Sequence, residues 1–172
     1  VHYETQEPIP DTYIDKLKAS KNFLSGHQML RQLYFAALDM KLHSTAVPDD
    51  AQTSDKWIYD IQKGIAAQYT ITPPLDNDRF LNGFSHIFGG GYAAGYYSYK
   101  YAEVMSADAF AAFEEVDGGL DNNVAVEALG RKFRDTVLSC GGGTHPAVVY
   151  KKFRGRGPTV DALLRHSGLQ KK

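Results

Sequence analysis

FSHIFGGGYAAGYYSY, residues 84–99, marks the change from a glycine-rich connector to the longest helix that the sequence predicts. Four of the 16 glycines and four of the 11 tyrosines in the chain lie between Gly89 and Tyr99. The preceding residues, 75–91, are predicted to form a connector, whereas helical spacing runs from about Tyr92 to Glu115. We therefore expect a loop that ends in three glycines, followed by a long helix that begins within a few residues of Tyr92.

The apolar residues of the remaining chain also repeat at helical spacing. Four of the other predicted helices cover about residues 28–42, 123–138, 144–149 and 158–168. Two more are predicted to begin at about residue 11 and at Ser54 or Asp55. No segment alternates apolar and polar residues as a half-buried strand would, and no convincing linker divides the chain. Residues 1–172 are therefore expected to form one all-α unit.

The tyrosines of the quoted stretch have a spacing that is informative for function. In a helix that begins near Tyr92, Tyr92, Tyr96 and Tyr99 follow the spacing i, i+4 and i+7, which places three phenols on one face. Tyr97 and Tyr101 lie on the other side and are expected to pack in the core. A helix of this kind is suited to lining a cleft.

His86 and the three glycines precede these tyrosines. Phenol and imidazole groups donate hydrogen bonds to an oxyanion as charge develops on it, which is what peptide hydrolysis requires. Glycines at 89–91 expose the backbone and allow another chain to approach closely. The same residues also fit a purely structural role. In that case the tyrosines are half-buried, the histidine makes its hydrogen bonds within the protein, and the glycines act as a hinge.

Composition and local motifs exclude several other classes. The formal net charge is −1, and the basic residues near the C-terminus (Lys151, Lys152, Arg154 and Arg156) are expected to be solvated, so nucleic acid is not an expected partner. No apolar run reaches the roughly 20 residues of a membrane span. Residues 89–94 match a loose dinucleotide-binding pattern, but no βαβ pattern surrounds them, and we reject that interpretation. A single cysteine, Cys140, fits a reducing compartment.

The sequence resembles the thimet oligopeptidase family of zinc metallopeptidases, and within it the oligopeptidase A branch. The resemblance rests on residues 84–99 and on further motifs in the family's order, namely HYET at 2–5, PIP at 8–10, RQL at 31–33, FRGRGP at 153–158, DALL at 161–164 and SGL at 167–169. It implies that the chain is the C-terminal helical portion of a zincin-type oligopeptidase catalytic domain.

The resemblance also implies roles for individual residues. His86 and Tyr92 match residues that stabilise the tetrahedral intermediate, and Tyr99 matches a tyrosine near the reacting carbonyl. Tyr96 matches a tyrosine that lines the substrate cleft, and Gly89, Gly90 and Gly91 match a flexible loop that adapts to the peptide. An oligopeptide substrate, the remainder of the parent catalytic domain as a partner, and a cytoplasmic or organellar (mitochondrial or chloroplast) location follow from the same resemblance.

The zinc-binding motif of the family, His-Glu-x-x-His, is missing. None of the six histidines is followed by glutamate, and in the family this motif precedes the region that matches His2. The resemblance therefore implies that zinc is bound in the parent enzyme by residues outside this chain, that no metal ligands lie within it, and that the chain alone is inactive. The alternatives are a stand-alone structural or peptide-binding subunit derived from such a peptidase, or an unrelated helical scaffold.

Overall fold

The computed structural model describes residues 1–49 and 54–170, and these residues contain helices and no strands. The α-helices are α1 (Asp11–Ser20), α2 (Ser25–Ser44), α3 (Ser54–Tyr69), α4 (Phe80–Gly83), α5 (Ser98–Glu114), α6 (Asn123–Phe133), α7 (Pro146–Arg154) and α8 (Asp161–His166). Three short helical turns complete the fold: η1 (Ser85–Ile87), η2 (Gly119–Asp121) and the π-helical η3 (Arg134–Leu138). The all-α fold class is confirmed.

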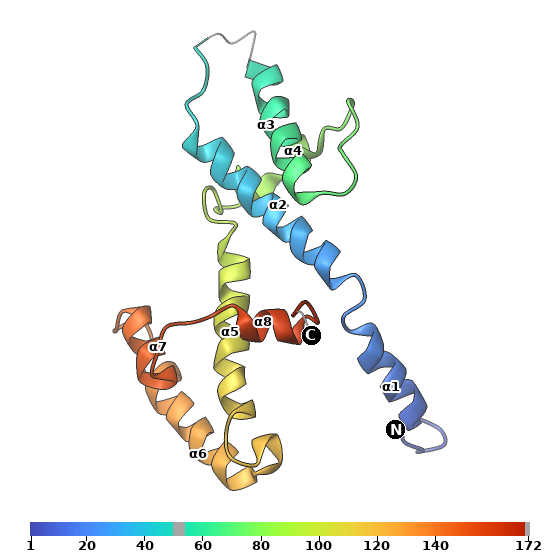
Figure 1. Cartoon of the computed structure of the whole chain (residues 1–172), viewed down its shortest axis with the longest axis vertical. Coiled ribbons are helices and arrows are strands. Elements are labelled where there is room, and N and C mark those ends of the chain that lie inside the picture. Colours follow the sequence, from blue (N-terminus) through green and yellow to red (C-terminus); the bar gives the residue numbers. More distant parts are fainter. Residues whose placement is uncertain (50–53, 171–172) are drawn as a thin grey trace.

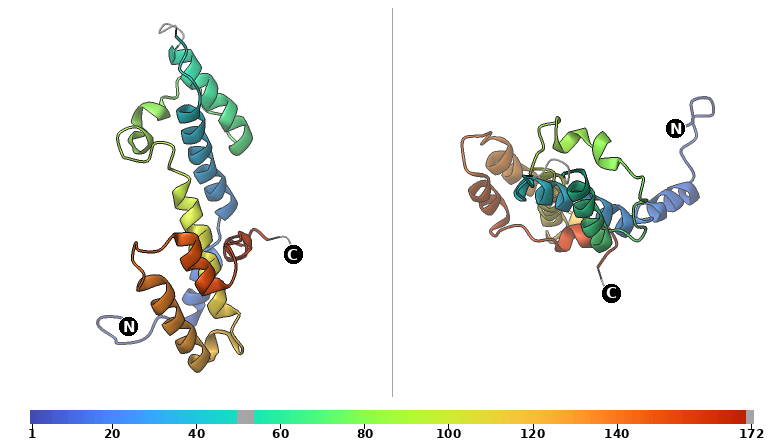
Figure 2. Two further views of the ribbon diagram at one scale, coloured as in Figure 1. Left: turned by 90° about the vertical axis from the view of Figure 1, so that its left-hand side faces the viewer. Right: turned by 90° about the horizontal axis from the view of Figure 1, so that it is seen from above.

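The helices form two groups that meet at the start of α5 (Figure 1). The N-terminal group contains α2, α3, α4 and η1, and the C-terminal group contains α5 to α8. α8 lies across α5, which it contacts, and α1 projects away from the other helices (Figure 1). The view from above also shows α1 projecting away (Figure 2). In agreement with this position, α1 buries none of its side chains.

The core of the N-terminal group lies between α2 and the elements that follow it. The α2 residues Leu38 and Phe35 are central: Leu38 is fully buried, and the Phe35 ring stacks on Phe80 with centroids 5.1 Å apart. A fully buried leucine contributes roughly 1.5–3 kcal/mol relative to an exposed one. The buried members of this core are Tyr34, Phe35, Leu38, Leu42, Ala66, Leu81, Phe84 and Ile87. This packing fixes α4 and η1, and therefore the start of the glycine loop, against α2.

The C-terminal group is organised around a buried carboxylate, Asp108 of α5. Its side chain is 1% exposed and accepts hydrogen bonds from the Tyr150 hydroxyl at 2.6 Å and from both terminal nitrogens of Arg156 at 2.7 and 2.9 Å. Arg154 reaches Asp108 at 3.4 Å and pairs with Glu115 at 2.8 Å. These bonds attach α7 and the segment after it to α5.

The last helix ends as the sequence predicts. Gly168 has a φ of 68°, and the N–H groups of Gly168 and Leu169 donate to the carbonyls of Arg165 and Leu164. This pair of bonds is the Schellman motif, in which glycine provides the left-handed residue. The Ser25 hydroxyl at the start of α2 donates to the Ser167 carbonyl at 2.7 Å, so the start of α2 is in contact with the end of α8.

Three expectations for the middle of the chain are wrong. The long helix α5 begins at Ser98, because residues 93–97 form turns before it. Tyr97 and Tyr101, expected in the core, are 52% and 53% exposed. In addition, residues 75–91 were expected to form a connector but contain α4 and η1.

Candidate functional site

The predicted site residues lie on the irregular segment between η1 and α5. His86 belongs to η1, Tyr92 follows the glycines, Tyr96 lies in the turn before α5, and Tyr99 is in the first turn of α5. The expectation that one helix face carries all three tyrosines is therefore wrong, because only Tyr99 is helical. The tyrosines are brought together by a folded loop.

Although residues 92–97 are not helical, the four rings form a continuous group. We call this group the His–Tyr cluster (His86, Tyr92, Tyr96 and Tyr99). The His86 and Tyr92 rings lie 6.0 Å apart, with planes inclined by 29°. Tyr99 lies 5.3 Å from Tyr92 and 5.1 Å from Tyr96, measured between centroids. Tyr92 and Tyr99 are 39% and 40% exposed, so both remain accessible to a ligand.

The glycine loop folds back tightly on His86, which precedes it in the sequence. The N–H groups of Gly89 and Gly90 both donate to the Ser85 carbonyl at 2.7 Å, and the Tyr92 N–H donates to the His86 carbonyl at 3.2 Å. A Cβ atom on Gly90 would lie 2.8 Å from His86 Cα, which is closer than carbon atoms can approach. The close contact that requires glycine at position 90 is therefore with His86 of the same chain.

The environment raises the pKa of two of the cluster's phenols. Burial raises the pKa of Tyr96, although the positive charge of Arg31 partly opposes this effect. Interaction with the neighbouring Tyr92 hydroxyl, together with a smaller effect of burial, raises the pKa of Tyr99. Both groups therefore retain their O–H as hydrogen-bond donors at neutral pH.

A hollow of about 530 Å³ opens beside the cluster, between α2 and the start of α5. Its lining includes Arg31 and Gln32 of α2, and the Gln32 side chain accepts a hydrogen bond from the Tyr96 hydroxyl at 3.0 Å. The full lining is Gln28, Arg31, Gln32, His86, Tyr96, Tyr99, Lys100 and Glu103. The α2 residues were not predicted as site residues, although Arg31 and Gln32 belong to a motif that carries the family resemblance.

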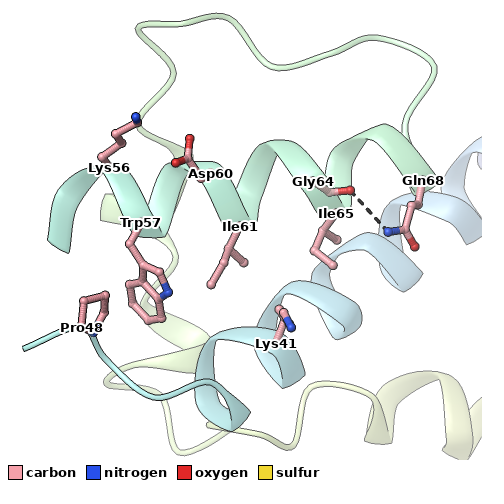
Figure 3. Close-up of a pocket in the computed structure, with 9 residues that line it drawn as sticks. All are labelled: Lys41, Pro48, Lys56, Trp57, Asp60, Ile61, Gly64, Ile65 and Gln68. Atoms are coloured by element: carbon pink, nitrogen blue, oxygen red, sulfur yellow. Dashed lines mark hydrogen bonds between the residues drawn. The ribbon is translucent and has the colours of Figure 1, made fainter. Parts of the chain in front are cut away.

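A second hollow, of about 640 Å³, lies between α2 and α3 (Figure 3). Trp57, Ile61 and Ile65 of α3 form its apolar wall, and Lys41 of α2 lies opposite them. None of its lining residues belongs to the His–Tyr cluster. Because it lacks the converging phenol and imidazole groups, we place the candidate site at the first hollow.

The described residues do not fit a metal site. Within residues 1–49 and 54–170, no three His, Cys, Asp or Glu side chains lie close enough together to hold a metal ion. Protein zinc sites generally use at least three such side chains. His86, the histidine of the cluster, lies beside the rings of Phe84, Tyr92 and Tyr96.

Residues 1–169 match peptidase family M3, a class of proteolytic enzymes. Because this match covers almost the whole sequence, the chain belongs to peptidase family M3. Membership of this family implies a zinc ion in the full-length enzyme.

The curated relatives include proteins named oligopeptidase A, which are much longer than this chain. The chain is 51% identical over 168 residues to the probable cytosolic oligopeptidase A of Arabidopsis thaliana, covering 98% of this chain and 23% of that protein. It is also 51% identical to the organellar oligopeptidase A of the same plant, covering 98% and 20%. Oligopeptidase A of Escherichia coli is 43% identical over 169 residues, covering 98% and 23%. The chain thus spans less than a quarter of the length of these relatives.

The names of the two Arabidopsis relatives give their locations: one is cytosolic, and the other is chloroplastic or mitochondrial. Within the part of the chain that the structure describes, no helix combines the length and the apolar character needed to cross a bilayer.

Proposed function

We propose that this chain is the C-terminal segment of an oligopeptidase that hydrolyses short peptides, and that it supplies hydrogen-bond donors for the oxyanion and part of the substrate channel. The observation that carries the proposal is the grouping of His86 with Tyr92, Tyr96 and Tyr99 beside a polar hollow, in a chain of peptidase family M3. The names of its relatives as oligopeptidases support the substrate class.

The proposed chemistry of the cluster is electrostatic. When the scissile carbonyl becomes tetrahedral, its oxygen acquires negative charge, and the Tyr92 hydroxyl and the His86 imidazole donate hydrogen bonds to it. Their ring centroids lie 6.0 Å apart, which supports assigning both donors to the same oxygen atom. Such preorganised donors stabilise the transition state more than the ground state.

The remaining site residues are assigned to substrate binding and alignment. Tyr99 keeps its proton and lies beside Tyr92, so it is available as a further donor near the reacting carbonyl. We assign Tyr96 and the loop of Gly89, Gly90 and Gly91 to the adjoining wall, where a peptide backbone would lie. In the full-length enzyme, residues outside this chain would hold the zinc ion, which would supply an activated water.

The test uses Tyr92→Phe in the full-length enzyme. This substitution removes one hydroxyl and keeps the ring, so stability changes little. If the hydroxyl donates to the oxyanion only in the transition state, kcat falls by about 10²–10³ while KM stays nearly constant. Steady-state kinetics on a short fluorogenic peptide measure both parameters.

Tyr97→Phe is the matched control. Tyr97 directly follows Tyr96 in the sequence, but its side chain is 52% exposed and lies outside the His–Tyr cluster. It should leave kcat close to wild type. Equal losses at the two positions would show that the tyrosines act through packing. A large rise in KM with unchanged kcat would make Tyr92 a substrate-binding group and not an oxyanion donor.

The proposal also requires that the chain belong to a longer protein, as its relatives do. The mass of the native protein from its source tests this requirement directly, since the chain itself accounts for 19.1 kDa. A native mass several times larger is expected. A native mass equal to that of the chain would favour the alternative of a stand-alone, non-catalytic subunit.

A further inference from the structure

Tyr96 is held at both ends by one face of α2. Its backbone N–H donates to Asp39 Oδ2 at 2.9 Å, and its phenol donates to Gln32 Oε1 at 3.0 Å. Between these bonds the Phe35 ring meets the Tyr96 ring at 87°, with centroids 5.7 Å apart. Gln32, Phe35 and Asp39 follow the spacing i, i+3 and i+7, which places them on the same side of a helix. This side of α2 fixes both the main chain and the ring of Tyr96.

Asp39 also holds the turn that precedes Tyr96. The Ala94 N–H donates to Asp39 Oδ1 at 2.9 Å. Ala94 has a φ of 52°, in the left-handed region that residues with a side chain rarely adopt. Such a conformation persists only where surrounding contacts enforce it. The bond to Asp39 is a contact of this kind, and it comes from a helix 55 residues earlier in the chain.

The burial of Asp39 makes these bonds hard to break. The residue is 0% exposed, and a buried carboxylate is costly unless its oxygens are hydrogen-bonded. The two backbone N–H groups meet this requirement, one at each carboxylate oxygen, and His43 Nδ1 lies 2.9 Å from Oδ1. A shift of the turn would leave a buried carboxylate oxygen without its donor, so the turn is held in one position.

From these contacts we propose that Asp39 is a positioning residue for the His–Tyr cluster, a role that rests on the proposed function of that cluster. By fixing Ala94 and Tyr96, it sets where the neighbouring Tyr92 and Tyr99 hydroxyls lie. The rings transmit this constraint, because Tyr99 is in contact with both Tyr96 and Tyr92. Asp39 itself lies beneath the loop and does not touch the substrate.

Asp39→Asn tests the first step of this role in the 172-residue chain. The side chain keeps its size, but one acceptor oxygen becomes an NH₂ donor, so one of the two backbone N–H groups loses its partner. Hydrogen exchange followed by ¹H–¹⁵N spectra should show the Ala94 or Tyr96 amide exchanging about 10- to 100-fold faster than in wild type. The helical amides of α2 should keep their wild-type rates.

Asp78→Asn is the matched control. The Asp78 carboxylate also accepts from a backbone amide, that of Phe80 at 3.0 Å, and from the Gln62 side chain at 2.9 Å, but it does not contact the turn before α5. It should leave the Ala94 and Tyr96 amides unchanged. Equal acceleration by both substitutions would reflect a general loss of stability and would overturn the proposal.

The second step is tested by kinetics of the same two variants in the full-length enzyme. Misplacement of catalytic groups by about 1 Å costs about 10²-fold in rate. Asp39→Asn should therefore lower kcat by about 10- to 100-fold with KM within about two-fold of wild type, whereas Asp78→Asn should leave both parameters near wild type. Accelerated amide exchange with an unchanged kcat would show that Asp39 is only structural.

Exchange in the wild-type chain gives a readout that does not depend on whether a variant folds. Ala94 and Tyr96 should exchange at least about tenfold more slowly than Ala93, whose N–H donates to no group in the described parts of the chain. Equal rates for the three amides would contradict the anchoring role of Asp39. An unchanged kcat in Tyr92→Phe would count against the proposed function alone, because the exchange measurement is independent of catalysis.

Discussion

At Asp108, burial of the carboxylate alone would raise its pKa, but hydrogen bonds from Arg156, Tyr150 and Arg154 outweigh that effect. The pKa of Asp108 falls from 3.8 to about 2. Because the folded pKa is lower than the unfolded one, the carboxylate stabilises the fold above pH 4, and this contribution is lost as the pH falls from about 4 to about 2. At full ionisation the contribution is about 2 kcal/mol.

Tyr150→Phe tests this pH dependence at the level of one hydroxyl. Removing the 2.6 Å bond to Asp108 should lower the free energy of unfolding by about 1.5–3 kcal/mol at pH 7. The loss should shrink toward pH 2, because protonated Asp108 gains less from the donor. Urea unfolding monitored by circular dichroism at pH 7, 4 and 2 measures the difference. An identical loss at every pH would show that the hydroxyl does not stabilise the charged form.

At the scale of elements, the glycine loop allows a comparison between adjacent positions. A Cβ atom on Gly90 would meet His86 Cα at 2.8 Å, whereas one on Gly89 would come no closer than 3.9 Å to the Ser85 carbonyl oxygen. Gly90→Ala should therefore destabilise the chain by about 1–3 kcal/mol through displacement of η1. Gly89→Ala should change the free energy of unfolding by less than about 0.5 kcal/mol. Chemical denaturation of both variants distinguishes them, and equal effects would contradict the tight packing of Gly90 on His86.

Two helix ends that are set by local residues were predicted from the sequence. The start of α1 after Pro10 and the end of α8 just before Gly168 both depend on backbone preferences of proline and glycine, which are visible in the sequence itself. The start of α8, in contrast, was placed at residue 158, whereas this helix begins at Asp161. The start of α5 was placed too early for the opposite reason. Asp39, far away in the sequence, accepts the N–H groups of Ala94 and Tyr96 and holds this segment as a turn.

The composition of the His–Tyr cluster was predicted, but its construction was not. Helical spacing suggested that Tyr92, Tyr96 and Tyr99 would meet, and they do meet, through a loop that helical spacing does not describe. The contribution of Gln32 and Asp39 was not predicted, because a polar residue inside an apolar helical stripe gives no sign of its partner. The catalytic and binding roles of the cluster stay predictions.

At the scale of the whole molecule, the isolated chain should bind no stoichiometric zinc at micromolar concentration. Its six histidines show no ligand spacing, and the described residues contain no cluster of metal-binding side chains. Elemental analysis of the purified chain after dialysis against zinc should therefore find far less than one metal ion per chain. One tightly held zinc per chain would contradict this prediction and reveal a ligand set not recognised in the sequence.

The contact between Ser25 and Ser167 has a consequence for the order in which the chain folds. Most pairs of helices that contact each other are close in sequence, whereas this contact joins residues 142 positions apart. Closing such a loop from a flexible chain costs about 2 kcal/mol more conformational entropy than closing one of about ten residues. We therefore expect the helical groups on either side of residues 93–97 to gain their own contacts first, and the junction between the start of α2 and the end of α8 to form late in folding and to open early in unfolding.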